Sequence, residues 1–305
     1  MSQKAQLVVK GKKLSVSNLD KVLYPKVGFT KGQVIDYFIR VAPVLLPHLK
    51  DRPLTMKRYP DGVEGEFFYE KNCPSHRPKW VKTAKVWSEG NQQIMHYCLA
   101  NDLPTLVWAA NLAVLELHTS LFRKNKIERP TTMVFDLDPG APADIVQCCQ
   151  VGVWLRDLLA EMKLKSWAKT SGSKGLQVYV PLNTAITYDE TKNLSRALAQ
   201  HLEHEHADRV TSNMSKAVRK GKVFVDWSQN DEHKTTICAY SLRAKEEPTV
   251  STPVTWNEVE NCLKKKNAQL LKFRSDQVLA RMEKLGDLFE PVENLKQKPP
   301  RKWKL

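Results

Sequence analysis

The sequence contains two aspartates, separated by one residue, whose carboxylates could act together. Asp136 and Asp138 lie in TMVFDLDPG, an apolar run that ends at a proline and a glycine and is typical of a buried strand. Side chains two residues apart point to the same face of a strand, so the two carboxylates repel each other. A divalent cation such as Mg²⁺ or Mn²⁺ relieves that repulsion. The pair therefore indicates a metal site, the alternative being a strand-end turn with two solvated aspartates.

A third acidic residue strengthens this hypothesis. Asp226 ends the apolar segment KVFVDW, which also has the pattern of a strand. If this strand lies beside the first, three carboxylates meet at one end of a sheet, an arrangement that holds two metal ions in phosphoryl transfer. The alternative is that Asp226 only caps a turn.

Two further segments carry residues suited to binding phosphates and bases. Between the acids, the small residues of KTSGSKG allow backbone N–H groups to approach an anion, with donors from Ser171 and Lys174. This segment is no Walker loop, and a flexible turn is the alternative. Phe67 and Phe68 precede a tyrosine, and strand alternation cannot bury all three, so an exposed base-stacking surface is expected unless they form a half-buried strand.

Composition limits the kinds of partner. The chain has 305 residues, with 48 Lys and Arg against 33 Asp and Glu, a formal net charge of +15. Such a surplus favours a polyanion, above all nucleic acid. The sequence has no apolar run of about 18 residues and no secretory signal at its start, so we expect a cytoplasmic, nucleoid-associated protein with no membrane partner.

The cysteines and histidines predict neither a disulfide nor a structural zinc site. The six cysteines form no C-x-x-C pair, so reduced thiols are expected. Neither Cys73 with His76 nor the cluster His201, His204 and His206 has the spacing of a structural zinc site.

The elements that must position these residues alternate between strand and helix. Helical spacing starts at Thr30 and continues to about residue 47, and further helices are expected near 103–117, 143–163 and 188–205. Strands are expected in 52–70, before Pro139, at 176–182 and at 222–227. This interleaving predicts an α/β or α+β fold with a mixed sheet.

The order of the motifs resembles the archaeo-eukaryotic primase superfamily and, more narrowly, the polymerase domain of bacterial ligase D. The resemblance is carried by DLDPG, SGSKGLQVYVPL, KVFVDW and AYSLRA, preceded by NLDKVLYP, PLTMKRYPDGV, FFYEKN and LELH. It implies a primase-polymerase catalytic core of mixed or antiparallel sheets flanked by helices. We expect one domain over 1–290: a DNA- and 5′-phosphate-binding part at 1–130, a metal-binding core at 131–245 and a helical part at 246–290. A basic mobile tail is expected at 291–305.

The resemblance also implies site residues. It assigns catalysis and the binding of two Mn²⁺ or Mg²⁺ ions to Asp136, Asp138 and Asp226. The positions that contact the incoming nucleotide or line its pocket are Lys57, His118, Ser171, Lys174, Gln177 and Arg243. The positions that contact DNA are Asn18, Lys21 and Lys31 for a downstream 5′-phosphate, Phe67 and Phe68 for template bases, and Arg219. One position departs from the family, because Gln177 stands where a histidine is usual and carries no positive charge toward the nucleotide phosphates.

The activity that this resemblance implies is template-directed addition of nucleotides to gapped or broken DNA in non-homologous end joining. The expected substrates are DNA with a 5′-phosphate and NTP or dNTP, with a preference for ribonucleotides. A separate ATP-dependent DNA ligase and the Ku protein are the expected partners. The alternatives are a DNA-end-binding module without catalysis, and a primase that starts chains without a primer.

Overall fold

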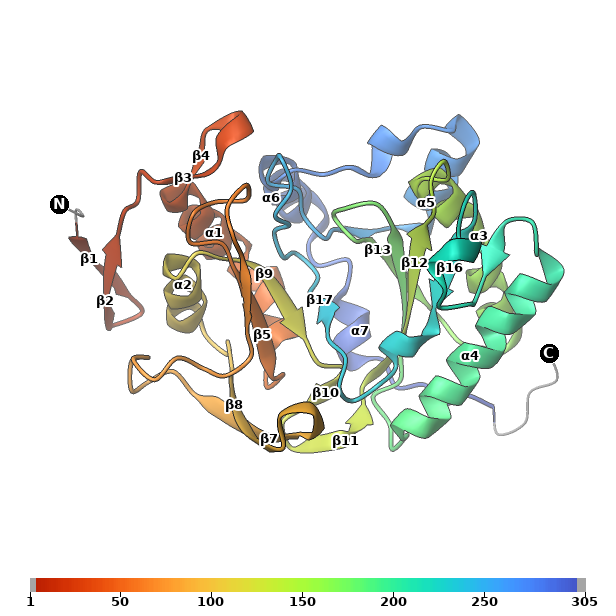
Figure 1. Ribbon diagram of the computed structural model, residues 1–305, viewed down its shortest axis with the longest axis horizontal. Coiled ribbons are helices and arrows are strands. Elements are labelled where there is room, and N and C mark those ends of the chain that lie inside the picture. Colours follow the sequence, from red (N-terminus) through yellow and green to blue (C-terminus); the bar gives the residue numbers. More distant parts are fainter. Residues whose placement is uncertain (1–3, 301–305) are drawn as a thin grey trace. The chain divides into compact units, whose positions relative to one another are not determined.

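Two six-stranded sheets organise the chain (Figure 1). The structure is a computed structural model, and it describes residues 4–300. The chain divides into two compact units. Unit 1 comprises Met1–Asn125, Thr235–Ser251 and Phe273–Asp287, and unit 2 comprises Lys126–Lys234, Thr252–Lys272 and Leu288–Leu305. The expected mixed α/β architecture is confirmed.

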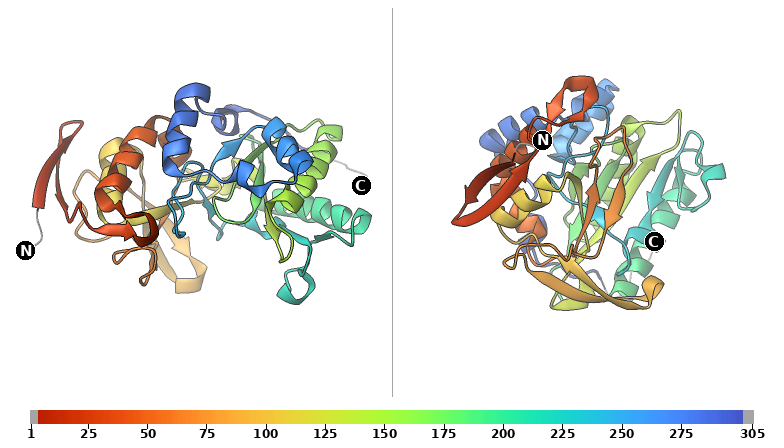
Figure 2. Two further views of the ribbon diagram at one scale, coloured as in Figure 1. Left: turned by 90° about the horizontal axis from the view of Figure 1, so that it is seen from above. Right: turned by 60° about the vertical axis from the view of Figure 1, so that its left-hand side comes forward.

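The sheet of unit 1 has the order β17-β9-β5-β8-β7, with β6 paired to β5. Its strands are β5 (Leu54–Arg58), β6 (Phe68–Glu70), β7 (Thr83–Ser88), β8 (Gln93–Cys98), β9 (Val114–Thr119) and β17 (Thr236–Ile237). Short strands outside this sheet are β1 (Lys4–Val9), β2 (Lys12–Ser17), β3 (Val22–Tyr24), β4 (Phe29–Thr30) and β10 (Phe122–Arg123). Figure 2 shows β1 and β2 as an antiparallel hairpin at the start of the chain.

The helices of unit 1 are α1 (Lys31–Leu49), α2 (Leu103–Asn111) and α6 (Ser275–Leu285), with 3₁₀ turns at Pro25–Val27 and Glu89–Asn91. Helix α1 begins at a capping box, in which Thr30 and Gln33 bond each other's backbone N–H groups. Its apolar residues recur at helical spacing and are buried, as the sequence predicted; they include Val34, Phe38 and Val41.

The sheet of unit 2 has the order β15-β16-β12-β14-β13-β18. Its strands are β12 (Thr132–Pro139), β13 (Trp167–Thr170), β14 (Leu176–Pro181), β15 (Val210–Thr211), β16 (Val223–Asp226) and β18 (Pro253–Val254), and β11 (Lys126–Pro130) precedes them. The central strand β12 pairs antiparallel with both β14 and β16. Two neighbours of β12 therefore present their residues directly opposite its aspartates.

Helices cover this sheet (Figure 1). They are α3 (Ile145–Glu161), α4 (Tyr188–Glu205), α5 (Trp256–Lys265) and α7 (Glu290–Asn294), with 3₁₀ turns at Lys216–Val218, Trp227–Gln229 and Ala268–Leu271. A Cβ added to Gly152 of α3 would meet Leu176 at 3.0 Å and Leu137 at 3.6 Å. Both leucines alternate with the polar residues of their strands, so α3 packs on the sheet face opposite Asp136.

The structure differs from the sequence-based expectation at residues 103–117. Helix α2 stops at Asn111, Ala113 has φ +59°, and the apolar run continues as β9 from Val114. A buried helix followed by a buried strand leaves a continuous apolar run, so periodicity did not separate the two.

The expectation of reduced thiols is wrong for two cysteines. Cys73 and Cys98 form a disulfide, and the other four cysteines are free and buried. The pairing arises because the Cys73 backbone N–H bonds His96 O on β8, which brings a loop beside a strand 25 residues further on. Cys73 is consequently not available as a partner of His76 in a metal site.

The first part of the expected mobile tail is held against the rest of unit 2. Helix α7 lies inside that segment, and the Gln297 side chain donates hydrogen bonds to Lys165 O and Pro181 O. The last five residues of the expected tail lie outside the described residues. Within residues 4–300, no helix has the length and apolar character that crossing a bilayer requires.

Candidate active site

The three aspartates come from neighbouring strands of unit 2. Asp136 of β12 lies directly opposite Asp226 of β16, and Asp138 lies two residues further along β12. Residues that oppose each other in a β-ladder share a face, so all three side chains leave the same side of the sheet. The structure thus brings together the acids that the sequence placed in separate strands.

One oxygen of the Asp136 carboxylate, Oδ1, is buried without a hydrogen bond to any of the described residues. Burial, followed by the charges of Asp138 and Asp226, raises the pKa of Asp136 to about 7, although Gln177 and Lys169 oppose that rise. A cation at this point would remove the cost of holding the carboxylate ionised.

A polar row extends from Asp136 across two more strands. Gln177 of β14 opposes Asp136, and Lys169 of β13 opposes Gln177. Lys169 is completely buried, and its ammonium donates to Gln177 Oε1 at 2.5 Å. The Gln177 side chain in turn hydrogen-bonds Asp136. Sequence reasoning missed Lys169, and the signal was its place before SGSKG, where an antiparallel return to Gln177 aligns the two.

Asp226 is a carboxylate with its own hydrogen bonds. Its Oδ1 accepts from the Ser228 backbone N–H at 2.9 Å and from the hydroxyl at 2.6 Å, and its Oδ2 accepts from the Gln229 amide at 2.9 Å. Asp226 thus caps a turn, the alternative that the sequence left open, and also lies opposite Asp136. Within residues 4–300, no three His, Cys, Asp or Glu side chains are arranged as a complete ion site.

The oxygen atoms of the three aspartates nevertheless suit a hard divalent cation. Asp136 offers a buried oxygen without a partner, Asp138 is exposed beside it, and Asp226 has oxygens held only by neutral donors that an ion can displace. Together these three side chains could hold metal in unit 2.

The loop after β13 is closed by its own polar groups. Ser171 Oγ accepts from the backbone N–H groups of Ser173 at 3.2 Å and Gly175 at 3.1 Å. A Cβ at Gly175 would lie 2.2 Å from Leu137 O, so glycine is required for the loop to lie against β12. Lys174 is exposed at the tip. The structure therefore places an exposed cation on a loop that contacts the strand of the acidic pair.

Arg219 lies in the same unit. Its guanidinium is 3.6 Å from the centre of the Phe224 ring and donates to Met214 O at 2.7 Å. Its Nε is buried without a partner among the described residues. The neighbouring backbone approaches β12, since a Cβ at Gly140 would lie 1.9 Å from Arg219 O.

In unit 1, three residues predicted to contact the nucleotide lie beside a buried glutamate. Glu116 accepts from His118 Nε2 at 2.9 Å and from Arg243 Nε at 3.2 Å, and Lys57 opposes it across the β5–β9 ladder. Burial raises the pKa of Glu116, but the hydrogen bond from His118 and the charges of Arg243 and Lys57 outweigh it and hold the pKa at about 2. Sequence reasoning missed Glu116, although it stands two residues before His118 in LELH.

The aromatic residues at the start of β6 and directly before it are exposed. Phe67 is 50% and Phe68 43% exposed, so the alternative of a half-buried strand does not hold. Lys57 Nζ lies 3.9 Å from the centre of the Phe67 ring, and the Arg58 guanidinium lies 4.9 Å from that of Phe68. Each ring is held by a cation while a large part of its surface remains free.

The three predicted 5′-phosphate contacts lie together where α1 begins. Lys31 N donates to Lys21 O at 2.8 Å, and Lys21 N donates to Asn18 O at 3.1 Å. Lys31 is buried, and its ammonium donates to Ser17 O at 2.8 Å, whereas Lys21 makes an exposed ion pair with Asp61. Burial, followed by the charges of Lys21 and Arg58, lowers the pKa of Lys31 to about 8.

The unit 2 sheet carries a carboxylate row at one end, with a loop bearing an exposed lysine beside it, and this is the arrangement expected of a primase-polymerase domain. The chain belongs to the family of the LigD primase-polymerase domain, whose family model matches residues 30–289. The resemblance stated from the motifs is confirmed.

The relatives agree with this assignment. The chain is 40% identical over 283 residues to the multifunctional non-homologous end joining protein LigD of Mycolicibacterium smegmatis, covering 92% of this chain and 36% of the relative. It is 34% identical to the bifunctional LigD protein of Bacillus subtilis, covering 94% of this chain and 45% of that one. The chain therefore spans less than half the length of these relatives.

A solved structure has the same fold. The polymerase domain of Mycobacterium tuberculosis ligase D, in complex with DNA, matches with a TM-score of 0.85 and 38% identity. The match covers 93% of this chain and 99% of that chain. The architecture described above is thus that of a ligase D polymerase domain.

Proposed function

We propose that this chain adds nucleotides to a primer strand at gapped or broken DNA ends, directed by a template. The observation that carries the proposal is the row formed by Asp136, Asp226 and Gln177 on neighbouring strands, with Asp138 beside it. The net charge of +15 and the similar domain solved with DNA support DNA as the partner. The names of the relatives support a role in non-homologous end joining.

Asp136, Asp138 and Asp226 are the residues that would hold two divalent ions, with Mn²⁺ proposed ahead of Mg²⁺. When bound, such ions supply activation of the primer 3′-hydroxyl and stabilisation of charge on the leaving pyrophosphate. Gln177 and Lys169 keep the Asp136 carboxylate in place and partly offset its charge repulsion. The protein's contribution is therefore a fixed, half-buried carboxylate array.

Each unit carries residues that are proposed, on their own, to contact the incoming nucleotide. In unit 2, Lys174 stands exposed on the loop that Ser171 closes. In unit 1, Glu116 fixes the Arg243 guanidinium and the His118 ring by direct hydrogen bonds. Gln177 remains a predicted nucleotide contact, but its buried amide already serves Asp136 and Lys169. A preference for ribonucleotides is part of this proposal.

DNA is proposed to bind to unit 1 through stacking and phosphate contacts. The exposed rings of Phe67 and Phe68 suit unpaired template bases, at about 1–3 kcal/mol per stacked base. Lys21, Lys31 and Asn18 are proposed to take the downstream 5′-phosphate. A separate ATP-dependent ligase and Ku are the proposed partners.

Primer extension on gapped DNA with Mn²⁺ tests the catalytic part. Asp136→Ala should bind the DNA but add no nucleotide, whereas Asp208→Asn, an exposed carboxylate of the same unit, should extend normally. Extension by Asp136→Ala at the rate of the unchanged protein would contradict the metal assignment. Omitting the primer in the same assay distinguishes a primase.

Binding to gapped DNA with and without the 5′-phosphate tests the phosphate pocket. Lys21→Ala should weaken binding only when the phosphate is present. Lys26→Ala, which removes another exposed lysine of the same region, is the control. Equal affinity of Lys21→Ala for both DNAs, at the level of the unchanged protein, would refute the pocket.

A further inference from the structure

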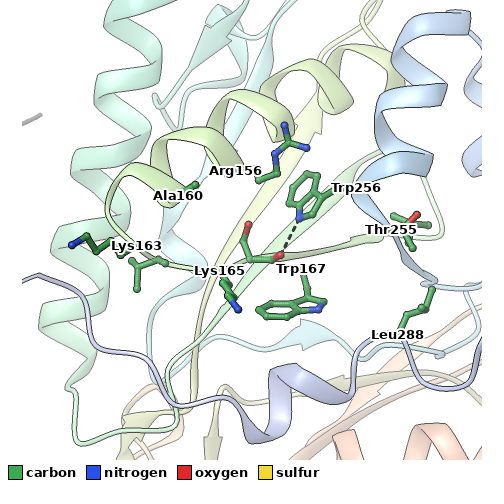
Figure 3. A pocket seen from close by; sticks show the side chains of 11 residues that line it. Arg156, Ala160, Lys163, Lys165, Trp167, Thr255, Trp256 and Leu288 are labelled. Carbon is green, nitrogen blue, oxygen red and sulfur yellow. Dashed lines mark hydrogen bonds between the residues drawn. The ribbon is translucent and has the colours of Figure 1, made fainter.

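Unit 2 contains a pocket that the proposed catalytic site does not use. Its volume is about 710 Å³, and it is lined by the end of α3, the connection into β13, and the segment from β18 into α5 (Figure 3). Trp167 begins β13, whereas the loop with Ser171 and Lys174 follows the other end of that strand. The pocket therefore lies at the strand end opposite the predicted catalytic loop.

Two tryptophans form much of its wall (Figure 3). Trp256 is fixed, because its indole N–H donates to Ser166 O at 2.9 Å and the Arg156 guanidinium lies 5.3 Å from the ring centre. Trp167 is half-buried, and its indole N–H has no hydrogen-bond partner among the described residues. One ring is thus held rigidly, and the other retains a free donor.

All the charged residues that line the pocket are basic. Of its eleven lining residues, Arg156, Lys163 and Lys165 are basic and none is acidic. Arg156 is compensated by ion pairs with Asp157 and Glu260. Lys163 and Lys165 are exposed and have no ion-pair partner within residues 4–300. Two uncompensated ammonium groups therefore stand beside the aromatic wall.

A buried hydroxyl adds an independent observation. Ser166 lines the pocket and is only 9% exposed, and its Oγ has no hydrogen-bond partner in the described part of the chain. Buried polar groups are nearly always paired, so an orphan of this kind calls for a polar partner. Because this oxygen is not accessible as it stands, a ligand in the pocket would reach it only if the Ser166 side chain turned toward the pocket.

We propose that this pocket binds an unpaired nucleotide of a single DNA strand, with the base against Trp167 and Trp256 and the phosphates at Lys163 and Lys165. A volume of 710 Å³ lies within the usual range for small-ligand pockets and leaves room for one base. Every base has a flat π-face, so stacking here is independent of sequence. An acidic peptide would match the charge, but the paired indole rings favour a planar aromatic group.

This inference goes beyond the proposed function and shares with it only DNA as the polyanion. A DNA end often carries a single-stranded extension, and this pocket gives unit 2 a contact of its own to such a strand. The contact needs neither metal nor nucleoside triphosphate. It can therefore be measured in the presence of EDTA, where no nucleotide addition occurs.

The experiment measures binding of a fluorescent dT₁₂ oligonucleotide to the full chain by anisotropy in EDTA, between 50 and 200 mM salt. Lys163→Glu/Lys165→Glu should weaken binding about tenfold or more and make the salt slope shallower by roughly 1–2, as expected when about two phosphate contacts are lost. The control, Lys264→Glu/Lys265→Glu, makes the same change in net charge in the last turn of α5. An equal loss in the control would overturn the proposal.

The aromatic contact has its own pair of variants. Trp167→Ala should weaken dT₁₂ binding roughly tenfold, whereas Trp167→Phe should retain most of it because a flat ring remains. Equal affinity for all three proteins would overturn the stacking role. Displacement of dT₁₂ by poly-glutamate as readily as by unlabelled dT₁₂ would indicate a protein partner and would also overturn the proposal. If the polymerase proposal were wrong but this one right, the protein would add no nucleotide in the primer-extension assay and would still bind dT₁₂ through this pocket.

Discussion

The ammonium of Lys169 donates a hydrogen bond to Gln177 Oε1 inside unit 2, where neither residue is more than 3% exposed. A lysine without solvent needs acceptors and negative charge, and Gln177 connects it to the Asp136 carboxylate. Gln177 therefore links a buried cation to a predicted metal ligand. A neutral imidazole can make the same two bonds, since one ring nitrogen accepts while the other donates.

Removing this link should destabilise the protein. In Gln177→Leu, the Lys169 ammonium loses an acceptor in a buried site, so the free energy of unfolding should fall by about 2–4 kcal/mol. In Gln177→His, the loss should stay below about 1 kcal/mol because both hydrogen bonds can be kept. Urea denaturation in EDTA measures both variants. A Gln177→Leu protein as stable as the unchanged chain would refute the link.

Glu116 should be a stability determinant of unit 1. It is 2% exposed and holds His118 and Arg243, so Glu116→Gln leaves nearby cations without their counter-charge. We expect a loss of about 3 kcal/mol in the free energy of unfolding. The control is Glu128→Gln, which removes an exposed ion pair with Arg129 and should cost less than about 0.5 kcal/mol. Equal midpoints of urea denaturation in the two variants would contradict this role.

The buried Lys31 should make stability depend on alkaline pH. Its pKa is lowered from 10.5 to about 8 in the folded protein, so the unfolded chain binds more protons between these values. The contribution of Lys31 to stability should therefore rise as the pH increases from 8 to 10.5, by an amount on the order of 2 kcal/mol.

Denaturation of the unchanged protein and Lys31→Met at a series of pH values checks this. The difference in stability between the two should change with pH in favour of the unchanged protein. The exposed Lys26, changed to Met, is the control and should show no comparable change. If the difference for Lys31→Met did not depend on pH, the pKa of Lys31 would not be lowered in the folded protein.

The meeting of the three acids in the candidate site could be predicted from the sequence, because strand alternation and the motif order locate Asp136, Asp138 and Asp226 without knowledge of side-chain conformation. The structure adds the register that aligns Asp226, Asp136, Gln177 and Lys169 in one row. That register depends on which strands are neighbours, which is a tertiary property. The disulfide of Cys73 and Cys98 could not be predicted for the same reason, since the pairing of a loop with β8 creates it.

In the absence of metal, the buried carboxylate of Asp136 should lower the free energy of unfolding. The pKa of Asp136 is raised to about 7, so the folded state resists ionisation of this group, and the unfolded chain ionises it near 3.8. The unfolded state thus binds fewer protons between these values, and the contribution of Asp136 to stability falls as the pH increases from 4 to 7. In EDTA at pH 8, Asp136→Asn should therefore be more stable than the unchanged protein, by an amount on the order of 1–3 kcal/mol.

Divalent ions should reverse that order. Binding to the folded state alone raises the melting temperature, so Mn²⁺ should stabilise the unchanged protein and leave Asp136→Asn nearly unaffected. Asp157→Asn, which changes a carboxylate paired with Arg156 outside the row, should respond to Mn²⁺ like the unchanged protein. Thermal denaturation with and without Mn²⁺ at pH 8 compares the three. If Mn²⁺ raised the melting temperature of Asp136→Asn as much as that of the unchanged chain, Asp136 would not be a ligand.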